Sequence, residues 1–304
     1  MTSSFHRSDN ADVYQQNASF VYSEKYTTPV LKLLDPQPGD RVLDLGCGNG
    51  TLTLQIAQIV GQPHPRTGRR GFVLGIDLSQ DMISKACIAR DQTGLTVAEV
   101  DFQTVDGYKL DEHLEMHGLN ATFDRVFSNA ALHWMSETPD LVMRNIHKAL
   151  REEGTLALEM GGYLNMIGVR MALHRAMKRR GVDPLEVDPW YFPSPEAYSK
   201  VVEAASSVSP FTIVSAELVP RITPLPGSGL RGWLQTFAGP FMNALDSENE
   251  RNLAADDVVE DCRPDMFDPA SGTWSCMYVR LRLKAVKGRD QGPEADTSSR
   301  AQEQ

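Results

Sequence analysis

The residues best suited to chemistry form a glycine-rich segment, Gly46-Cys47-Gly48-Asn49-Gly50, with Asp44 two residues before it. An apolar run precedes the segment, and an apolar helical pattern begins at Thr51. Glycine allows a sharp turn and a close approach to a ligand, and such a turn between strand and helix typically binds a nucleotide-like cofactor. The spacing is G-x-G-x-G, not the dinucleotide fingerprint G-x-G-x-x-G. Because Asp44 would repel a pyrophosphate, the segment predicts a ligand with a cationic or amino group.

A second acid follows the next apolar run. Residues 71–76 read as a strand, Asp77 comes directly after them, and a helix opens at Leu78. An acid at this place typically binds ribose hydroxyls, about 20 residues after the glycines. Asp77 lies further out because residues 61–70 read as an inserted surface loop. A plain helix-entry role for Asp77 is the alternative. With the glycine segment, these features indicate S-adenosylmethionine, which carries an ammonium, a carboxylate and a sulfonium.

Four segments, in this order, resemble the class I S-adenosylmethionine-dependent methyltransferases: VLDLGCGNG, VLGIDLSQDMI, FDRVFSNAALHWM and LREEGTLALEMGG. Within that superfamily, SNAALHWM and the earlier DVYQQNASFVY are most similar to the trans-aconitate methyltransferase-like group of small-molecule enzymes. The resemblance implies an α/β fold with a Rossmann-like, doubly wound sheet of seven strands. Most of these strands would be parallel and the last one antiparallel, with helical lid insertions.

The resemblance also implies which residues hold the cofactor. The three glycines would surround its methionine part, Asp77 its ribose, and Asp101 with Phe102 its adenine; a turn acid is the alternative for Asp101. An N-terminal lid would add two aromatic residues. The expected cofactor contacts are Tyr14, Phe20, Asp44, Gly46, Cys47, Gly48, Gly50, Asp77, Leu78, Met82, Asp101, Phe102 and Asn129.

The order of apolar segments predicts an alternating α/β core over residues 36–162, preceded by lid helices at 1–35. Residues 163–286 are expected to form a substrate lid and the strands that complete the sheet. Residues 287–304 are charged and polar and read as a disordered tail. Within these regions, strands are expected at 95–100, 123–128, 155–160, 211–220 and 276–283, and helices at 106–120, at 166–178 and from Ser194-Pro195 onward, the last two in the lid.

Methyl transfer from a sulfonium depends on alignment and exclusion of water, because the donor is already activated. A carboxylate acceptor needs no base, whereas a phenol or alcohol does, most plausibly histidine. His133, just beyond the fourth expected strand, is a candidate catalytic base, a donor that orients a carboxylate, or a wall of the pocket. Arg231 is preferred over Arg170, Arg175 and Arg221 as a carboxylate clamp. The expected substrate contacts are His133, Trp134, Trp190, Tyr191, Arg231 and Trp233.

The predicted function is S-adenosylmethionine-dependent O-methylation of a small-molecule carboxylate, as the resemblance to the trans-aconitate group implies. One alternative is an enolic or phenolic hydroxyl of a secondary metabolite such as a polyketide pyrone, which the aromatic lid residues favour. A second alternative is a cofactor-binding regulatory subunit without turnover.

Composition narrows the partners and the location. The net charge of -10 argues against a nucleic-acid substrate. No apolar run is long enough for a transmembrane helix, and the polar N-terminus does not read as a secretory signal, so a cytoplasmic location is expected. The four cysteines lack metal-ligand spacing and are read as reduced thiols. His113 and His117 have helical spacing, but a solvated helix face is preferred and no metal is expected. The oligomeric state stays open.

Overall fold

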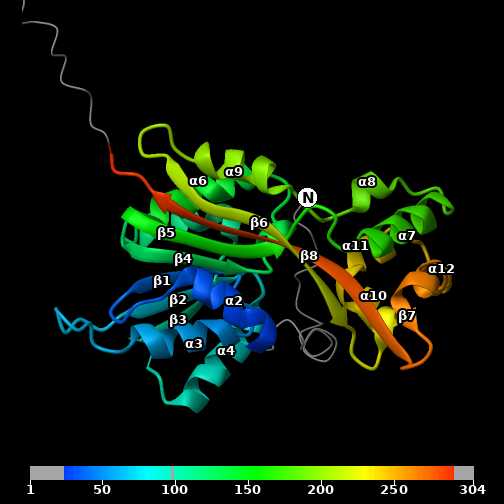
Figure 1. Ribbon diagram of the computed structural model, residues 1–304, viewed down its shortest axis with the longest axis horizontal. Helices are drawn as coiled ribbons and strands as arrows, with labels where there is room; N and C mark the ends of the chain where they lie inside the picture. Colours follow the sequence, from blue (N-terminus) through cyan, green and yellow to red (C-terminus); the bar gives the residue numbers. More distant parts are fainter. Residues whose placement is uncertain (1–23, 97–98, 291–304) are drawn as a thin grey trace, which may run out of the picture.

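A central mixed sheet organises the structure, a computed structural model that describes residues 24–96 and 99–290 (Figure 1). Seven strands are hydrogen-bonded in the order β3-β2-β1-β4-β5-β8-β6, and short β7 pairs with β8. The strands are β1 (Arg41–Leu45), β2 (Phe72–Asp77), β3 (Val100–Thr104), β4 (Phe123–Asn129), β5 (Leu150–Gly161), β6 (Phe211–Pro224), β7 (Phe267–Asp268) and β8 (Thr273–Lys287).

The strand directions confirm the predicted Rossmann-like sheet. Strands β1 to β5 pair in parallel, and β8 is antiparallel to both β5 and β6. In this register Arg282 lies opposite Glu159, and Arg280 lies opposite Gly161. The antiparallel last strand therefore brings basic residues to the carboxyl end of β5, where ligands bind in open α/β sheets.

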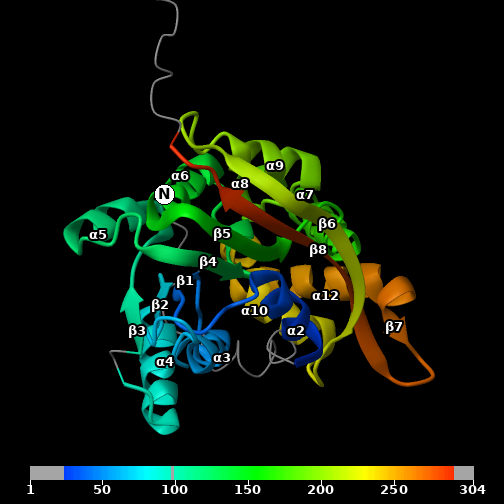
Figure 2. The same ribbon diagram turned by 60° about the vertical axis from the view of Figure 1, so that its left-hand side comes forward.

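Helices cover both faces of the sheet, as Figure 2 shows. They are α2 (Glu24–Leu34), α3 (Thr51–Val60), α4 (Gln80–Thr93), η3 (Gly107–Lys109), α5 (Leu110–Met116), η4 (Leu132–Trp134), α6 (Pro139–Ala149), α7 (Ile167–Lys178), α8 (Pro184–Val187), α9 (Pro195–Glu203), α10 (Gly229–Phe237), α11 (Gly239–Asn243) and α12 (Glu248–Met266).

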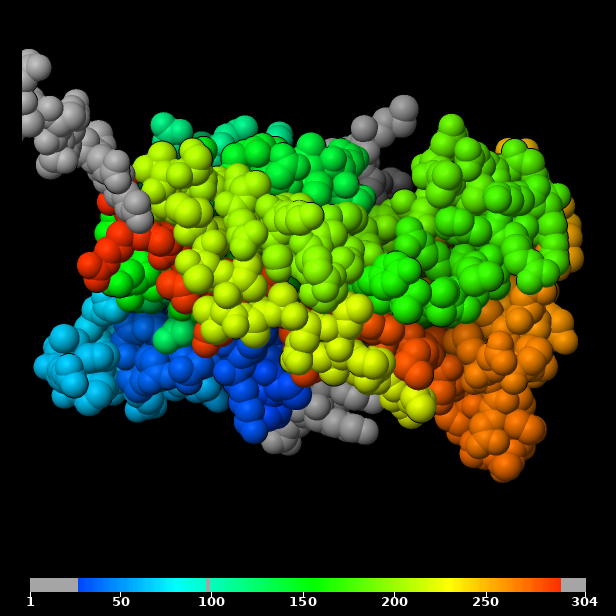
Figure 3. All heavy atoms as spheres, turned by 45° about the horizontal axis from the view of Figure 1, so that its top comes forward, coloured from blue at the N-terminus to red at the C-terminus, as the bar shows by residue number. Residues whose placement is uncertain are grey.

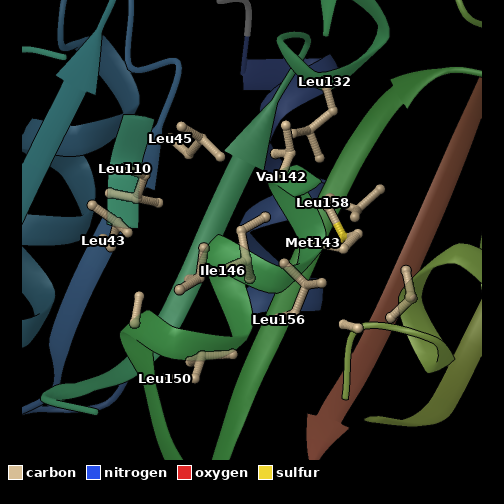
Figure 4. Close-up of a cluster of buried hydrophobic side chains, with 14 of the residues drawn as sticks. Leu43, Leu45, Leu110, Leu132, Val142, Met143, Ile146, Leu150, Leu156 and Leu158 are labelled. Atoms are coloured by element: carbon tan, nitrogen blue, oxygen red, sulfur yellow. The ribbon is translucent and has the colours of Figure 1, made fainter. Parts of the chain in front are cut away.

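Two hydrophobic cores form because apolar residues alternate along the buried strands. On one face, Leu43 and Leu156 pack against α5, α6 and α9 (Figure 4). On the other face, Val42 and Phe127 pack against α2, α3 and α4. The parallel strands are thus buried on both sides, which leaves their carboxyl ends as the accessible edge of the sheet.

A separate helical lobe, α7, α8 and α10–α12, stands beside this core and has its own hydrophobic cluster (Figures 1 and 3). The long strands β6 and β8 extend from the core sheet to this lobe, and Cys276 and Tyr278 of β8 belong to its cluster. Residues 163–286 therefore contribute to both the lobe and the core.

Helix α9 corrects one part of the predicted lid. The expected cap is present, since Ser194 Oγ accepts a hydrogen bond from Ala197 N at 3.2 Å. However, Tyr198 and Val202 are buried in the core cluster that includes α6 and β6. The apolar face of this helix therefore belongs to the core and not to a lid over the cavity.

The C-terminal boundary is also corrected. Lys287, expected to begin a disordered tail, is the last residue of β8 and is buried. Its Nζ donates to the carbonyl oxygens of His147 and Leu150, at 2.8 and 2.7 Å, at the end of α6. A cation in this place satisfies carbonyl groups that the helix leaves unpaired. Residues 291–304 lie outside the described residues.

The third strand begins at Val100, five residues later than the expected start at Leu95. The carboxylate of Glu99 accepts hydrogen bonds from both the backbone N and the hydroxyl of Thr96, each at 2.9 Å. These local bonds form a turn where the β-branched residues alone indicated a strand. The shift moves the carboxyl end of β3 to Thr104, beside Asp77. The predicted helix over 106–120 is shorter as well, comprising η3 and α5.

Candidate functional site

The glycine segment forms a tight loop between β1 and α3. Gly46, Gly48 and Gly50 all have positive φ, at 78°, 55° and 79°. A Cβ on Gly46 would lie 2.2 Å from Ala131 Cβ, and one on Gly50 would lie 2.7 Å from the ring of Phe102. Both the backbone conformation and the close packing therefore require glycine at these two positions.

The backbone amides of this loop are largely used within the protein. Gly46 N and Cys47 N both donate to Ile76 O, and Gly50 N donates to Cys47 O. Gly48 N donates to Asp77 Oδ2 at 2.9 Å. A phosphate-binding loop instead points its amides at the ligand. The internal bonds argue against a pyrophosphate, as the sequence suggested, and suit a ligand with a cationic group.

Asp77 links the ends of β1, β2 and β3. Its second carboxylate oxygen, Oδ1, accepts from Ser79 N at 2.9 Å, and its carbonyl oxygen accepts from Val105 N at 3.0 Å. Asp77 is partly exposed at the end of β2, so it retains access to a ligand. Its neighbours Leu78, which is 45% exposed, and Met82 lie at the start of α4 on the same side.

Asp44 is held inside the protein, with 2% of its surface exposed. Its Oδ2 accepts a hydrogen bond from Thr53 Oγ1 at 2.6 Å, across the glycine loop. Burial raises the pKa of Asp44 to about 7, and the nearby negative charge of Asp77 adds to this rise. A carboxyl group in this state can gain a full negative charge when a cation arrives.

The predicted adenine contacts, Asp101 and Phe102, both belong to β3. Asp101 lies opposite Leu74, three residues before the end of the strand. Its carboxylate accepts from Gln103 Nε2 and from Phe102 N. The ring of Phe102 packs in the core against Gly50 and Gly75.

A further acid, Asp106, follows the end of β3 and was not among the predicted cofactor contacts. Its Oδ1 accepts from Tyr108 N at 3.0 Å and caps η3. A strand placed five residues later along the chain would have identified it. The signal was the pair Thr96 and Glu99, which can form a turn through their side chains.

The remaining predicted cofactor residues fall into three groups. Cys47 is buried, and burial raises the pKa of its thiol, so it packs in the loop instead of reacting. Asn129 ends β4, and its buried Oδ1 has no hydrogen-bond donor among the residues that the structure describes. Tyr14 and Phe20 lie outside the described residues.

A cavity lies between the core and the helical lobe, beside the turn that follows β4. The empty space within it, including its open mouth, is about 570 Å³. The wall nearest the glycine loop is Ala130, whose neighbour Ala131 contacts Gly46. Its lining residues are Ala130, His133, Trp134, Asn165, Met166, Arg170, Trp190, Phe192, Arg221, Trp233, Phe237, Tyr278 and Arg280.

Two of the cavity arginines share a buried carboxylate. Glu159, which is 2% exposed, has Oε1 at 3.3 Å from Arg280 Nε and at 3.7 Å from Arg221 Nη1. Arg282 Nε lies 2.7 Å from Oε2 of the same group. Both cavity guanidiniums also lie 5.9 Å from the centre of the Tyr278 ring. Three guanidinium groups thus gather around one buried carboxylate at this end of the cavity.

The third cavity arginine, Arg170, is fully engaged with its own partner. Its Nε donates to Asp188 Oδ2 at 2.6 Å, and Nη2 donates to Trp190 O at 3.2 Å. Asp188 is 4% exposed and also bonds His174 Nε2, at 2.7 Å. Trp190 N donates to the other oxygen of Asp188. The pair fixes the backbone of the aromatic segment 188–192.

Of the aromatic residues predicted to contact the substrate, three line the cavity and one does not. Trp134, Trp190 and Trp233 line the cavity, as predicted, and Trp233 Nε1 donates to Tyr278 Oη at 2.7 Å. Tyr191 does not line it: the ring points to Tyr198 of the core, 6.0 Å between centres. Phe192 takes its place, stacked on Trp190 with 11° between the rings.

Arg231, the predicted carboxylate clamp, is not among the residues that line the cavity. It is 41% exposed on α10 and forms an ion pair with Asp256 of α12. Arg175 is exposed too and faces Asp261. The helical face of α10 that carries Leu230, Trp233 and Leu234 is the one that turns inward. The missed residue is Arg280, which the alternation of β8 places on the same face as Tyr278.

His133 is buried between the loop after β4 and the end of β5. Its Nδ1 accepts a long hydrogen bond, 3.4 Å, from Gly161 N, and its ring lies 5.8 Å from that of Phe192. A nitrogen that accepts from a backbone amide carries no proton, so the neutral ring carries its proton on Nε2. In this form Nε2 is a hydrogen-bond donor.

Within residues 24–96 and 99–290, no helix is both long and apolar enough to cross a bilayer. The same residues include no group of three or more metal-binding side chains. His113 and His117 stack with ring centres 4.5 Å apart, without a third ligand in that region.

Comparisons with known proteins agree with this geometry. A family model described as a methyltransferase domain matches residues 36–173. An uncharacterized methyltransferase of Schizosaccharomyces pombe is 34% identical over 289 residues, which are 91% of this chain and 97% of the relative. Trans-aconitate 2-methyltransferase of Deinococcus radiodurans is 28% identical over 229 residues, 70% of this chain and 75% of the relative.

A solved structure has the same fold. Phosphoethanolamine N-methyltransferase 2 of Haemonchus contortus, in complex with phosphomonomethylethanolamine and S-adenosylhomocysteine, superposes with a TM-score of 0.52 at 16% identity, over 92% of this chain and 57% of that one. At this identity the likeness bears on the fold alone. Together with the extensive match to the Schizosaccharomyces pombe relative, the sheet order and the glycine loop establish that the chain belongs to the class I S-adenosylmethionine-dependent methyltransferases.

Proposed function

We propose that the protein methylates a carboxylate oxygen of a small-molecule acid. The observation that carries this proposal is the pair of guanidinium groups, of Arg221 and Arg280, that line the inner end of the cavity beside Glu159. Guanidinium groups bind carboxylates through charge-assisted and often bidentate hydrogen bonds, so this end of the cavity suits an anionic acceptor. The Deinococcus radiodurans relative, named for trans-aconitate, supports an acid as the acceptor.

The reaction needs no proton transfer at the acceptor. A carboxylate oxygen forms the new C–O bond with the methyl carbon, while the C–S bond breaks and its electron pair remains on sulfur. The protein contributes alignment and a dry cavity, which supply most of the rate in such a displacement. His133 Nε2 would donate to the acceptor carboxylate and hold it next to Ala130.

For the cofactor, we propose that Asp77 accepts from the ribose hydroxyls and Asp106 from the adenine amine. Asp44 and the Oδ1 of Asn129 would face the ammonium group of the methionine part. The support is position: Asp77, Asp106 and Asn129 follow or end neighbouring parallel strands at the edge where ligands bind. Leu78, whose apolar side chain is exposed beside Asp77, would cover the adenine.

A hydroxyl acceptor, the alternative, would require His133 to take a proton on Nε2. The hydrogen bond from Gly161 to Nδ1 favours the opposite tautomer, in which Nε2 already carries a proton. A basic role would therefore require the ring to give up that bond. The donor role needs no such change, so the carboxylate acceptor is preferred.

The first prediction compares Asp101, which lies within β3, with Asp106, which follows the end of that strand. Replacement Asp106→Ala should raise the Kd for S-adenosylmethionine about tenfold, whereas Asp101→Ala should change it by less than about twofold. Calorimetric titration measures both. Because Asp106 also caps η3, Asp106→Ser serves as a control that retains a capping hydroxyl but is too short to reach a ligand. Equal effects of the Asp101 and Asp106 variants would contradict the assignment.

Asp44 generates a second prediction, through its pKa of about 7 against 3.8 for the free side chain. Because the folded value is the higher one, the free protein holds a proton that its unfolded chain has released, and its stability falls as the pH rises from about 4 to 7. An ammonium beside Asp44 favours the ionised form. Cofactor binding should then release a proton and tighten by up to about tenfold per pH unit between 5.5 and 7.

This linkage is measured by titration calorimetry in buffers of different ionisation enthalpy. Above pH 7 the affinity should level off, because Asp44 is already ionised. Asp44→Asn should bind more weakly and lose both the buffer dependence and the pH dependence. Affinity that stays constant from pH 5.5 to 7 in the unmodified protein would exclude the ammonium contact.

The main test compares two arginines. Arg221→Met should lower kcat/KM for an acid acceptor by about 10- to 100-fold, because a charge-assisted hydrogen bond is lost. Arg221 is preferred over Arg280 because its contact with Glu159 is the longer one. Arg231→Met is the matched control on the exposed side of α10 and should leave kcat/KM unchanged. Transfer of labelled methyl groups provides the assay; equal loss in both variants would reject the clamp.

His133 is tested with two variants of different hydrogen-bonding capacity. His133→Gln retains a donor and should keep kcat within about tenfold, whereas His133→Phe removes it and should lose more. Rates measured from pH 6 to 9 should show the same pH profile for the unmodified enzyme and His133→Gln. If His133 is a base, glutamine should be as inactive as phenylalanine.

A further inference from the structure

We infer that Asp188 is a specificity-determining residue, which acts by pairing with Arg170 in the wall of the cavity. Because of this pairing, the end of the cavity formed by the helical lobe does not attract a second carboxylate of the acceptor. The inference rests on the proposed function and specifies which acids the same site discriminates against.

Arg170 is the charged residue that the helical lobe contributes to the lining of the cavity. It belongs to α7, whereas Arg221 and Arg280 belong to β6 and β8. The lining residues that the described chain adds from the lobe and from the segment before α9 are uncharged: Met166, Trp190, Phe192, Trp233 and Phe237. The electrostatic state of Arg170 therefore decides whether this end of the cavity attracts an anion.

The guanidinium of Arg170 remains accessible to a ligand. Its Nε donates to Asp188 Oδ2 at 2.6 Å, and its Nη2 donates to Trp190 O at 3.2 Å. Its Nη1 has no hydrogen-bond partner within residues 24–96 and 99–290, and the side chain is 34% exposed. Such a guanidinium would bind a carboxylate if it had no acid of its own.

Asp188 is that acid, and the protein holds it firmly in place. Its side chain is 4% exposed. Its Oδ2 also bonds His174 Nε2 at 2.7 Å, and its Oδ1 accepts from Trp190 N at 3.1 Å. A neutral imidazole can make the first of these bonds with a proton on Nε2, so the pair of Arg170 and Asp188 carries no net charge.

A second carboxylate at this end of the cavity would compete with Asp188 for one guanidinium. The two anions would repel each other, and the acceptor would lose the hydration of a charge without gaining a full counter-charge. An acid with an uncharged group at the same place carries no such cost. Asp188 thus supplies the unfavourable element by which a binding site rejects a competing ligand.

The test uses the full-length enzyme, labelled S-adenosylmethionine and two matched pairs of acids. Crotonate and fumarate share a short skeleton that ends in a methyl group or in a second carboxylate. Sorbate and trans,trans-muconate have the same difference on a longer skeleton. The measured quantity is the ratio of kcat/KM for the diacid to kcat/KM for the monoacid of the same length, at pH 8, where free histidine is neutral.

Asp188→Asn should raise this ratio by about 10- to 100-fold for at least one pair, because Arg170 then pairs with the second carboxylate. Asparagine retains an oxygen that can accept from Trp190 N. The matched control is Asp256→Asn, which removes the exposed acid that pairs with Arg231 in the same lobe and should leave the ratio unchanged.

Two further variants assign the effect to Arg170. The double variant Arg170→Met with Asp188→Asn removes both charges, and its ratio should return to within about threefold of that of the unmodified enzyme. Arg170→Gln alone leaves a negative charge beside the cavity and should lower the ratio. This variant tests the inference independently if Asp188→Asn does not fold.

A merely structural role of Asp188 would change kcat/KM for both acids of each pair by the same factor, and that result would overturn the inference. A raised ratio that persists in the double variant would overturn it as well, because the effect would then not pass through Arg170. An unchanged ratio in both Asp188→Asn and Arg170→Gln would have the same meaning.

Binding of the four acids, measured by titration calorimetry with S-adenosylhomocysteine present, distinguishes this inference from the proposed function. If no acid is methylated but Asp188→Asn shifts binding toward the diacids, the proposed function fails and the inference holds. If the acids are methylated but the ratio does not move, the inference fails and a carboxylate methyltransferase remains. If none of the acids binds to the unmodified protein or to the variants, both fail.

Discussion

A single buried carboxylate, Glu159, connects the parts of this protein that build the acceptor cavity. It belongs to β5 of the core, and its partners Arg280 and Arg282 belong to β8, while Arg221 belongs to β6. Its backbone oxygen also accepts from Ala130 N, in the turn after β4. Removal of this carboxylate would leave three guanidiniums close together in a poorly solvated place, a cost of several kcal/mol. The antiparallel insertion of β8 is what brings these charges together, because it places basic residues opposite the end of β5.

The parallel part of the fold followed from the sequence with little ambiguity. The short apolar runs that end in Asp77 and in the glycine segment indicate parallel strands, because a parallel strand is buried on both faces and its residues are therefore apolar throughout. The cofactor edge was predictable because strand ends determine it. The third strand was the exception: Thr96 and Glu99 form two hydrogen bonds through the carboxylate of Glu99, and the strand begins only at Val100, which places Asp101 within the strand and not beyond it.

The acceptor site was less predictable because it depends on tertiary pairing. Arg231 and Arg221 look alike in the sequence, and neither helical nor strand periodicity says which one meets a buried acid. Arg231 forms an ion pair with Asp256 on the neighbouring helix α12. Arg221 of β6 instead contacts Glu159 of β5, and β8 lies between these two strands. Tyr191 and Phe192 are adjacent, and the segment 188–192 turns one ring to the core and the next to the cavity. That choice depends on the backbone of Trp190, whose N donates to Asp188 and whose carbonyl oxygen accepts from Arg170 of α7.

The charged end of the cavity lies on strands of the sheet, while its aromatic end comes from the helical lobe and the segment before α9. Under the proposed function, recognition of charge and recognition of shape would therefore be encoded in separate stretches of the chain. Replacement of α10 or of residues 188–192 would then change which molecular skeleton is accepted without disturbing the ion cluster. An enzyme built in this way would diversify its acceptors by exchanging short segments, with the reactive end of every acceptor presented in the same way.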